Sequence, residues 1–348
     1  MKAAAIFAFL AAGGFAQEPA AGPPAEGGEC LSRQIRLVDS YRISGDYGAA
    51  ERILRECLPL EHADSESRLI NQIALADLLR EEDRSAEARK LFVQTMDSPK
   101  SDWKLRLDAL IGMADIDLNE GDLKGSIDGW DKALEIARDV GDARSEAIAL
   151  RGLGSAWLES GSAARAEPLL RRSLQMLESD VKSPPSQVAA SLGAMAGYYL
   201  TDNKLALAED TWSRALTIQR ATLGENHPQV AYTMEMLAGI YSQRGETELA
   251  CEYGERAAEM MRRFFGEGSP VAATALANLA MVEERVHALG DAATNYEAAV
   301  GILRQLPNLR PTAQVVLQHY AAVLRALHRN REAKAVEMEI KAFRPGAK

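Results

Sequence analysis

The feature that most constrains this chain of 348 residues is an internal repeat of about 40 residues. Two runs with apolar residues at helical spacing, separated by a short polar turn, recur from the first third of the chain to its end. The aligned turn positions are Gly45, Asp83, Gly121, Gly161, Asn203, Gly245, His287 and His328. A fixed period of this length is typical of stacked helix pairs. Each repeat therefore predicts one helix–turn–helix unit.

Small residues at fixed distances from these turns indicate that the helices pack closely. The residues five positions after each turn are Ala50, Ala88, Ser126, Ala166, Ala208, Ala250, Ala292 and Ala333. Small side chains allow two helix backbones to approach, and the large apolar residues beside them fill the space that remains. The mid-helix glycines Gly152 and Gly154 occupy packing positions and do not form a nucleotide-binding fingerprint.

Helix-capping signals agree with these boundaries. Pro185, Pro228, Pro270 and Pro311 each stand just before an apolar-periodic run, where a missing backbone N–H costs nothing. Ser269 is expected to cap the helix that Pro270 begins. Gly224 and Gly266 are expected at helix C-termini.

With its Leu-Gly-x-x-His-Pro link at Leu223–Pro228, the pattern resembles the tetratricopeptide repeat, in the 42-residue form of kinesin light chains. The resemblance covers nearly all of residues 31–345. It implies an all-α fold, a right-handed superhelical solenoid of about eight helix pairs over residues 30–345. A helix pair cannot bury its apolar face alone, so neighbouring pairs stack into one continuous core.

The N-terminus carries a different signal. Lys2, the apolar run Ala3–Ala12 and the small residue Ala16 are typical of a secretory signal peptide over residues 1–16, with Gln17 first after cleavage. A buried N-terminal helix is the alternative. Residues 17–29 are rich in Pro, Gly and Ala and predict a flexible linker. The expected location is therefore outside the cytoplasm, in a periplasm or secreted. No later apolar run is long enough to cross a membrane.

The net charge of −10 argues against nucleic acid as a partner. Cys30 and Cys57 lie at the ends of one predicted helix hairpin and are a candidate disulfide in an oxidising compartment. Two free thiols are the alternative, because the sequence cannot supply the required geometry. Cys251 has no predicted partner.

The sequence shows no catalytic constellation. The five histidines have no metal-binding spacing to one another or to a cysteine, and no nucleophile elbow or phosphate-binding glycine loop occurs. His287 and His328 are expected to be turn residues. We therefore expect no enzyme activity, no metal and no cofactor.

The resemblance implies that the first helix of each pair lines a concave groove. The residues that this predicts for ligand binding are Arg151, Ser155, Gly193, Gly197, Tyr232, Glu235, Gly239 and Gln243. The acids Asp77, Asp115, Glu159 and Glu284 flank them. Glycine inside a helix costs about 1 kcal/mol relative to alanine. Glycines on one face therefore suggest close approach of a ligand backbone, with helix packing or simple tolerance as alternatives.

These features predict an exported, non-catalytic scaffold that binds a basic or apolar segment of another protein in the groove. The alternative is a structural component of a cell-envelope assembly that self-associates through its end repeats. The charged last helix, Arg331 to Phe343, favours a monomer.

Overall fold

The computed structural model describes residues 34–38, 41, 47–60, 65–82, 84–306 and 310–342. All regular elements among these residues are helical, which confirms the all-α class. The predicted signal peptide, the linker and Cys30 lie outside the described residues, so they stay predictions. Cys57 is completely buried at the end of its helix, and Cys251 is a free thiol.

The chain forms two compact units, and the division falls between Asn203 and Lys204 in the turn of the fifth repeat. The helices of the N-terminal unit are α2 (Tyr47–Cys57), α3 (Glu66–Glu81), α4 (Ser85–Asp97), α5 (Trp103–Glu120), α6 (Leu123–Val140), α7 (Ala143–Glu159), α8 (Ala163–Ser179) and α9 (Pro185–Thr201). The short 3-10 helix η2 (Leu58–Leu60) follows α2.

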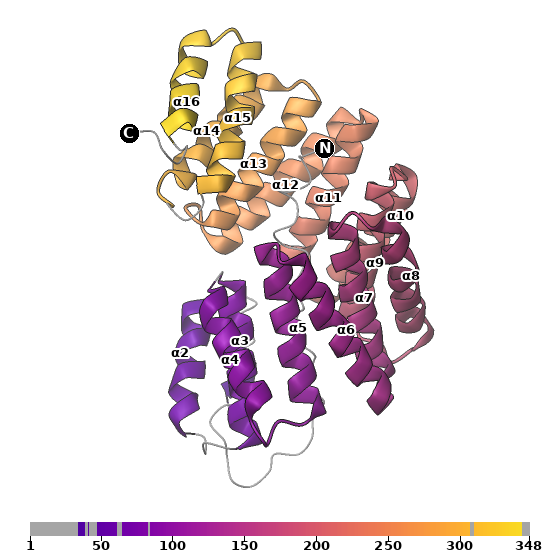
Figure 1. The fold of residues 1–348 in the computed structure, drawn as a ribbon. Helices are drawn as coiled ribbons and strands as arrows, with labels where there is room; N and C mark the ends of the chain where they lie inside the picture. The colour runs from indigo at the N-terminus through magenta and orange to yellow at the C-terminus, as the bar shows by residue number, and fades with distance from the viewer. Residues whose placement is uncertain are drawn as a thin grey trace. The chain divides into compact units, whose positions relative to one another are not determined.

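The helices of the C-terminal unit are α10 (Leu205–Leu223), α11 (Pro228–Arg244), α12 (Thr247–Phe265), α13 (Pro270–Arg285), α14 (Leu289–Leu303), α15 (Arg310–Ala326) and α16 (Asn330–Ala342) (Figure 1). These bounds follow the repeat that the sequence predicts. The handedness of the predicted superhelix stays an expectation.

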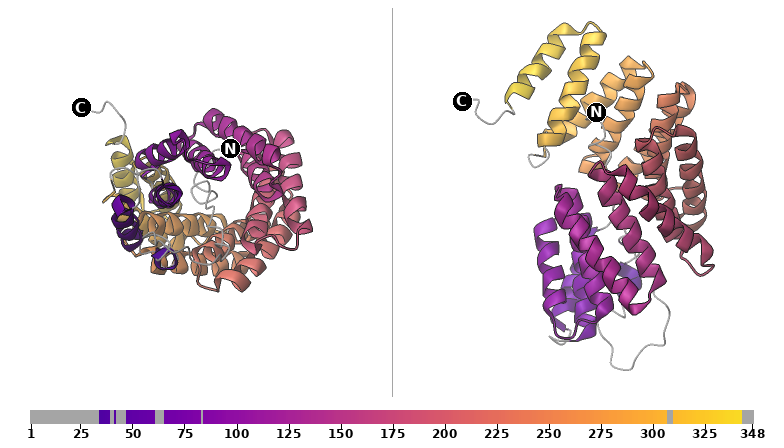
Figure 2. Two further views of the ribbon diagram at one scale, coloured as in Figure 1. Left: turned by 90° about the horizontal axis from the view of Figure 1, so that it is seen from below. Right: turned by 45° about the vertical axis from the view of Figure 1, so that its right-hand side comes forward.

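Within each unit, consecutive helices pack as hairpins, and each hairpin stacks on the next (Figures 1 and 2). The first helices of neighbouring hairpins also contact one another: α3 with α5, α5 with α7 and α7 with α9, then α11 with α13 and α13 with α15. Contacts between consecutive second helices are weaker among the described residues. The first helices therefore lie on the inner side of each stack. We call their open surface the first-helix face.

The turns between paired helices have the backbone conformation that their sequences suggest. Gly121, Gly161 and Gly245 have φ of 82°, 78° and 75°, the left-handed region that favours glycine. Asn203, His287 and His328 take the same conformation with φ of 54°, 64° and 60°. Asparagine and histidine are among the residues that enter this region most readily. The prediction that His287 and His328 are turn residues is therefore confirmed.

The predicted caps are also confirmed. Pro185, Pro228 and Pro270 are the first residues of α9, α11 and α13. The Ser269 hydroxyl accepts a hydrogen bond from the Ala272 backbone N–H at 3.0 Å. At the start of α11, Nδ1 of His227 accepts one from the Gln229 N–H at 3.1 Å, so this ring nitrogen is unprotonated there.

In the N-terminal unit, hairpins are joined by aromatic rings that lie on glycines. A Cβ atom at Gly112 would lie 2.2 Å from Cζ of Phe92, and one at Gly152 would lie 2.3 Å from Cε2 of Trp130. Both rings are buried and come from the second helix of the preceding hairpin. At Gly154 a Cβ would meet Leu170 at 2.7 Å. The interpretation of Gly152 and Gly154 as packing positions is confirmed.

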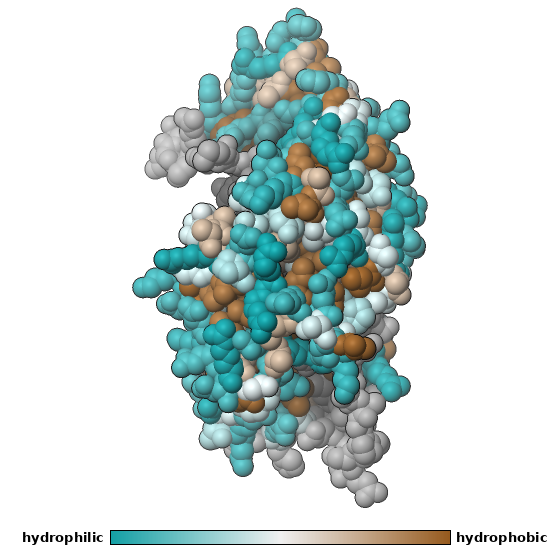
Figure 3. Space-filling view, turned by 90° about the vertical axis from the view of Figure 1, so that its right-hand side faces the viewer, coloured by the Kyte–Doolittle hydropathy of each residue, from teal (hydrophilic) through white to brown (hydrophobic). Residues whose placement is uncertain are grey.

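The face drawn in Figure 3 is mainly hydrophilic, with interspersed hydrophobic patches. Such a surface is expected when the apolar side of each helix packs into the stack. Across the described ranges, no helix combines the length and apolar character that a bilayer-spanning segment needs.

Candidate binding face

The residues that the sequence predicts for ligand binding lie on three first helices. Arg151 and Ser155 belong to α7, and Gly193 and Gly197 to α9, all in the N-terminal unit. The four predicted residues of α11, in the C-terminal unit, are Tyr232, Glu235, Gly239 and Gln243. Each unit therefore carries its own part of the predicted site. That α9 and α11 present one shared surface stays a prediction.

The part in the N-terminal unit is open at its centre. A Cβ atom at Gly197 would meet only Cδ2 of Leu158 among the described atoms, at 3.9 Å, an ordinary van der Waals contact. Arg151, Ser155 and Gly193 are half-buried, so each is accessible on the adjacent helices α7 and α9. Gly197 therefore differs from Gly112 and Gly152, where a ring fills the place of the missing side chain.

The part in the C-terminal unit follows one side of α11, because residues three or four apart share a helix face. Tyr232 is half-buried, and its ring lies edge-on to Trp212 of α10, with centroids 5.9 Å apart at 77°. No described atom lies within 4 Å of the position that a Cβ at Gly239 would take. Gln243 is exposed. This side thus offers an oriented aromatic ring, an open backbone position and a polar end.

Glu235 differs from the expectation of an accessible groove acid, because it is only 7% exposed. Asn278 of α13 donates a hydrogen bond from Nδ2 to its Oε1 at 2.5 Å. Burial raises the pKa of Glu235 to about 7, and the bond from Asn278 opposes that rise. The carboxyl group is therefore partly protonated at neutral pH. It connects two first helices and does not present a full negative charge to a ligand.

Asp115 is a second acid that the structure places differently, since it is 7% exposed on α5. The guanidinium of Arg80 lies 3.6 Å from its carboxylate and also 3.6 Å from that of Asp77. Burial raises the pKa of Asp115 to about 6, although Arg80 and Arg151 oppose the rise. Asp108, half-buried nearby on α5, has its pKa raised to about 6 by burial and by the charge of Asp77. The first-helix face is thus less anionic here than its composition suggests.

Glu284 on α13 belongs to a hydrogen-bonded cluster with two neighbouring helices. The hydroxyl of Tyr296 on α14 donates to its Oε2 at 2.8 Å, and Nδ1 of His319 on α15 lies 3.0 Å from the same oxygen. Burial alone would raise the pKa of Glu284, but the bonds from His319 and Tyr296 outweigh it and lower the pKa. The same bond raises the pKa of His319. This cluster links α13, α14 and α15 through Oε2 of Glu284, whose side chain remains 29% exposed.

The chemical groups on these faces are suited to contact with a ligand. Within the described ranges, no cluster of three His, Cys, Asp or Glu residues could hold a metal ion. The accessible elements are an aromatic ring, backbone at glycines, and amide and hydroxyl groups. Such groups recognise a ligand by contact and hydrogen bonding.

The chain belongs to the tetratricopeptide repeat family, whose model matches residues 105–179, 187–250 and 236–305. This confirms the resemblance that the repeat spacing indicates. A tetratricopeptide fold is typically a non-catalytic interaction scaffold. No curated protein sequence matches the chain significantly.

Known structures confirm the fold at low sequence identity. BtubC (BKLC) from P. vanneervenii is 22% identical over 65% of this chain and 95% of its own, with a TM-score of 0.57. The TPR-like repeats of a protein described as a kinesin light chain from Podosopora anserina are 19% identical to this chain. The match covers 57% of this chain and 95% of theirs, with a TM-score of 0.51. A Rap protein complexed with Competence and Sporulation Factor is 12% identical to this chain. The match covers 90% of this chain and 99% of the Rap protein, with a TM-score of 0.56.

Proposed function

We propose that this protein is a scaffold that binds a segment of another protein on its first-helix faces. The segment would pass with its backbone close to Gly197 in the N-terminal unit or Gly239 in the C-terminal unit. Tyr232 would act as an anchor there, because a ring held by a neighbouring aromatic loses little conformational freedom on binding. The Rap protein of similar fold was crystallised with Competence and Sporulation Factor, which supports this type of binding for the architecture.

The open space at Gly197 and Gly239 is the observation on which this proposal rests. Glycine inside a helix costs about 1 kcal/mol relative to alanine. At Gly112 and Gly152 the close ring explains the absence of a side chain, but at Gly197 and Gly239 no described atom lies close enough to do so. Packing among the described residues therefore does not account for these two glycines. Approach of a ligand backbone would account for them, and simple tolerance, as at the equally open Gly301 of α14, is the alternative that the substitutions below test.

The segment that best suits these faces is apolar or aromatic. The sequence alone also favours a basic segment, chiefly because of Glu235. Since Glu235 is buried and Asp115 is paired with Arg80, two of the acids that would attract a basic ligand are unavailable. Binding to the first-helix faces should accordingly depend little on salt.

Substitution of the two open glycines tests this proposal. Gly197→Trp and Gly239→Trp should each block a segment that passes over the respective helix, while Tyr232→Ala should weaken binding by about 1–3 kcal/mol. The measurement is affinity capture from extracts of the producing cells, with partners quantified by mass spectrometry against the unaltered protein.

Gly301→Trp is the matched control, because it adds the same bulk on α14, a second helix, at a position with no described atom within 4 Å. It should leave capture unchanged. Helicity and Tm of every variant must stay near those of the unaltered protein. If all four variants fold and capture the same partners, the first-helix faces are not the binding surface.

We further propose that the protein is exported and acts in a periplasm or outside the cell. Lys2, the run Ala3–Ala12 and Ala16 support this proposal. Intact-mass analysis of protein isolated from the producing cells should give a chain that begins at Gln17. Recovery of the chain with Met1 from the cytoplasm would refute export.

A further inference from the structure

The C-terminal unit has an open pocket of about 590 Å³ between α12, α13 and α14. It lies on the second-helix side, where α12 and α14 contact each other only weakly. The residues of α13 that line it, Leu276, Leu279 and Glu283, are 5%, 6% and 3% exposed. Leu276 and Leu279 of α13, with Ala258 of α12, form its apolar part. This pocket is separate from the first-helix face and does not depend on the function proposed above.

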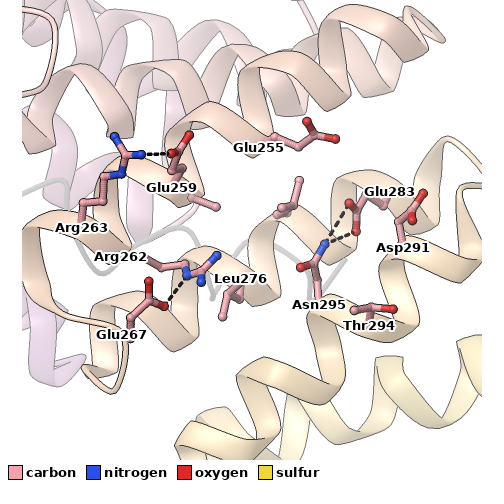
Figure 4. Close-up of a pocket in the computed structure, with 12 residues that line it drawn as sticks. Glu255, Glu259, Arg262, Arg263, Glu267, Leu276, Glu283, Asp291, Thr294 and Asn295 are labelled. Atoms are coloured by element: carbon pink, nitrogen blue, oxygen red, sulfur yellow. Dashed lines mark hydrogen bonds and ion pairs between the residues drawn. The ribbon is translucent and has the colours of Figure 1, made fainter.

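Both arginines that line the pocket are already neutralised. Arg263 forms an ion pair with Glu259 at 2.5 Å, and Arg262 forms one with Glu267 at 2.7 Å. Figure 4 shows these two pairs together at one end of the pocket. Their charges cancel locally, so they neither attract an anion nor compensate the acids at the other end.

Three carboxylates, those of Glu255, Glu283 and Asp291, line the remaining wall, one from each of the three helices (Figure 4). No described cation forms an ion pair with any of them. Glu283 is 3% exposed, and Asn295 donates a hydrogen bond of 2.9 Å to each of its oxygens. Burial raises the pKa of Glu283 to about 7, with the charges of Asp291 and Glu255 adding to the rise and Asn295 opposing it. An incoming cation would relieve this mutual repulsion.

We propose that this pocket binds an arginine side chain of a partner protein. The planar guanidinium has donors on several sides and can face more than one carboxylate at once. The aliphatic stem of arginine would lie on Leu276 and Leu279, as such stems do on apolar surface. The pocket thus matches both parts of this side chain, the charge and the stem.

A short labelled peptide tests the proposal on the full chain. The probe is fluorescein-labelled Gly-Leu-Arg-Leu-Gly, compared with the same peptide carrying citrulline, which keeps the shape of arginine without its charge. Fluorescence anisotropy should show about tenfold tighter binding of the arginine peptide. The double variant Glu255→Gln with Asp291→Asn should lose about tenfold in affinity for it. Both altered residues are exposed, so the fold should be retained.

The matched control is Glu252→Gln with Glu297→Gln, which removes the same charge from exposed positions of α12 and α14 that do not line the pocket. It should bind the arginine peptide as the unaltered protein does. Equal or absent binding of the two peptides would overturn the proposal. Equal losses in the two double variants would do so as well, because they would show attraction by net charge alone.

Discussion

Replacement of Gly152 by leucine is expected to destabilise the N-terminal unit by about 3 kcal/mol, because overpacking a tight core costs this much. The first added carbon would already lie 2.3 Å from the Trp130 ring, well inside contact distance. The indole is 3% exposed and held between hairpins, so it cannot move out of the way without disturbing α6 and α7. Urea unfolding followed by circular dichroism should show a lower midpoint for Gly152→Leu.

Two further variants separate this clash from a general effect of glycine replacement. Gly197→Leu, in the same unit, adds the same side chain beside only Leu158 at 3.9 Å and should stabilise by up to about 1 kcal/mol through helix propensity. Trp130→Ala alone should lower the free energy of unfolding by about 3–5 kcal/mol. The double variant Trp130→Ala with Gly152→Leu should lose less unfolding free energy than the two single variants together, because leucine occupies the space that the indole vacates. Strict additivity in this double-mutant cycle would contradict direct contact between the two positions.

The repeat and its boundaries could be predicted from sequence because they rest on local chemistry. Turn residues such as Gly121 and Gly245 take a backbone conformation that few other residues adopt easily. Proline at the start of α9, α11 and α13 and serine at the cap of α13 act within one helical turn. Such signals do not depend on how distant helices pack, so they transfer from sequence to structure reliably.

Burial of charged residues could not be predicted in the same way. Spacing correctly places Glu235 on a first helix but cannot reveal that Asn278, more than 40 residues away, hydrogen-bonds to it. In the alignment on turns, the position of Trp130 corresponds to Gly254 in α12, and that of Gly152 corresponds to Asn278. The aromatic ring that joins hairpins in the N-terminal unit is thus absent between α12 and α13. The hydrogen-bonded pair of Glu235 and Asn278 lies near this junction instead. A comparison of the residues nine positions before and nine positions after each turn could have indicated that this repeat lacks the ring and its glycine.

The pocket on the second-helix side was also beyond sequence reasoning. Its acids come from three helices and are ordinary members of charged helix faces when they are read along the chain. The pairs Arg263–Glu259 and Arg262–Glu267 are local in sequence. Only the packing of α12, α13 and α14 brings Glu255, Glu283 and Asp291 to one wall, where none of them has an ion pair with another described residue. Charge balance at a site is a property of tertiary structure, which composition and periodicity do not encode.

Glu235→Gln is expected to stabilise the C-terminal unit by up to about 3 kcal/mol above pH 7. The pKa of Glu235 is raised from 4.5 to about 7 in the folded protein, because burial favours the neutral carboxyl group. A raised pKa contributes stability that is fully present below pH 4.5 and is lost as the pH rises to 7. Glutamine stays neutral throughout and can still accept the hydrogen bond from Asn278. The difference in unfolding free energy between variant and unaltered protein should therefore grow from pH 4.5 to 7 and then level off.

Glu284→Gln provides a control of opposite sign on α13. The pKa of Glu284 is lowered, because the bonds from His319 and Tyr296 outweigh the effect of burial. A lowered pKa contributes stability at neutral pH that is lost as the pH falls through the folded value, so this variant should be less stable than the unaltered protein at pH 7. Thermal unfolding of all three proteins from pH 4 to 8 measures both effects. A constant difference between Glu235→Gln and the unaltered protein over this range would show that Glu235 is ionised in the folded state. Glu235 would then carry a negative charge that could attract a basic segment to the first-helix face.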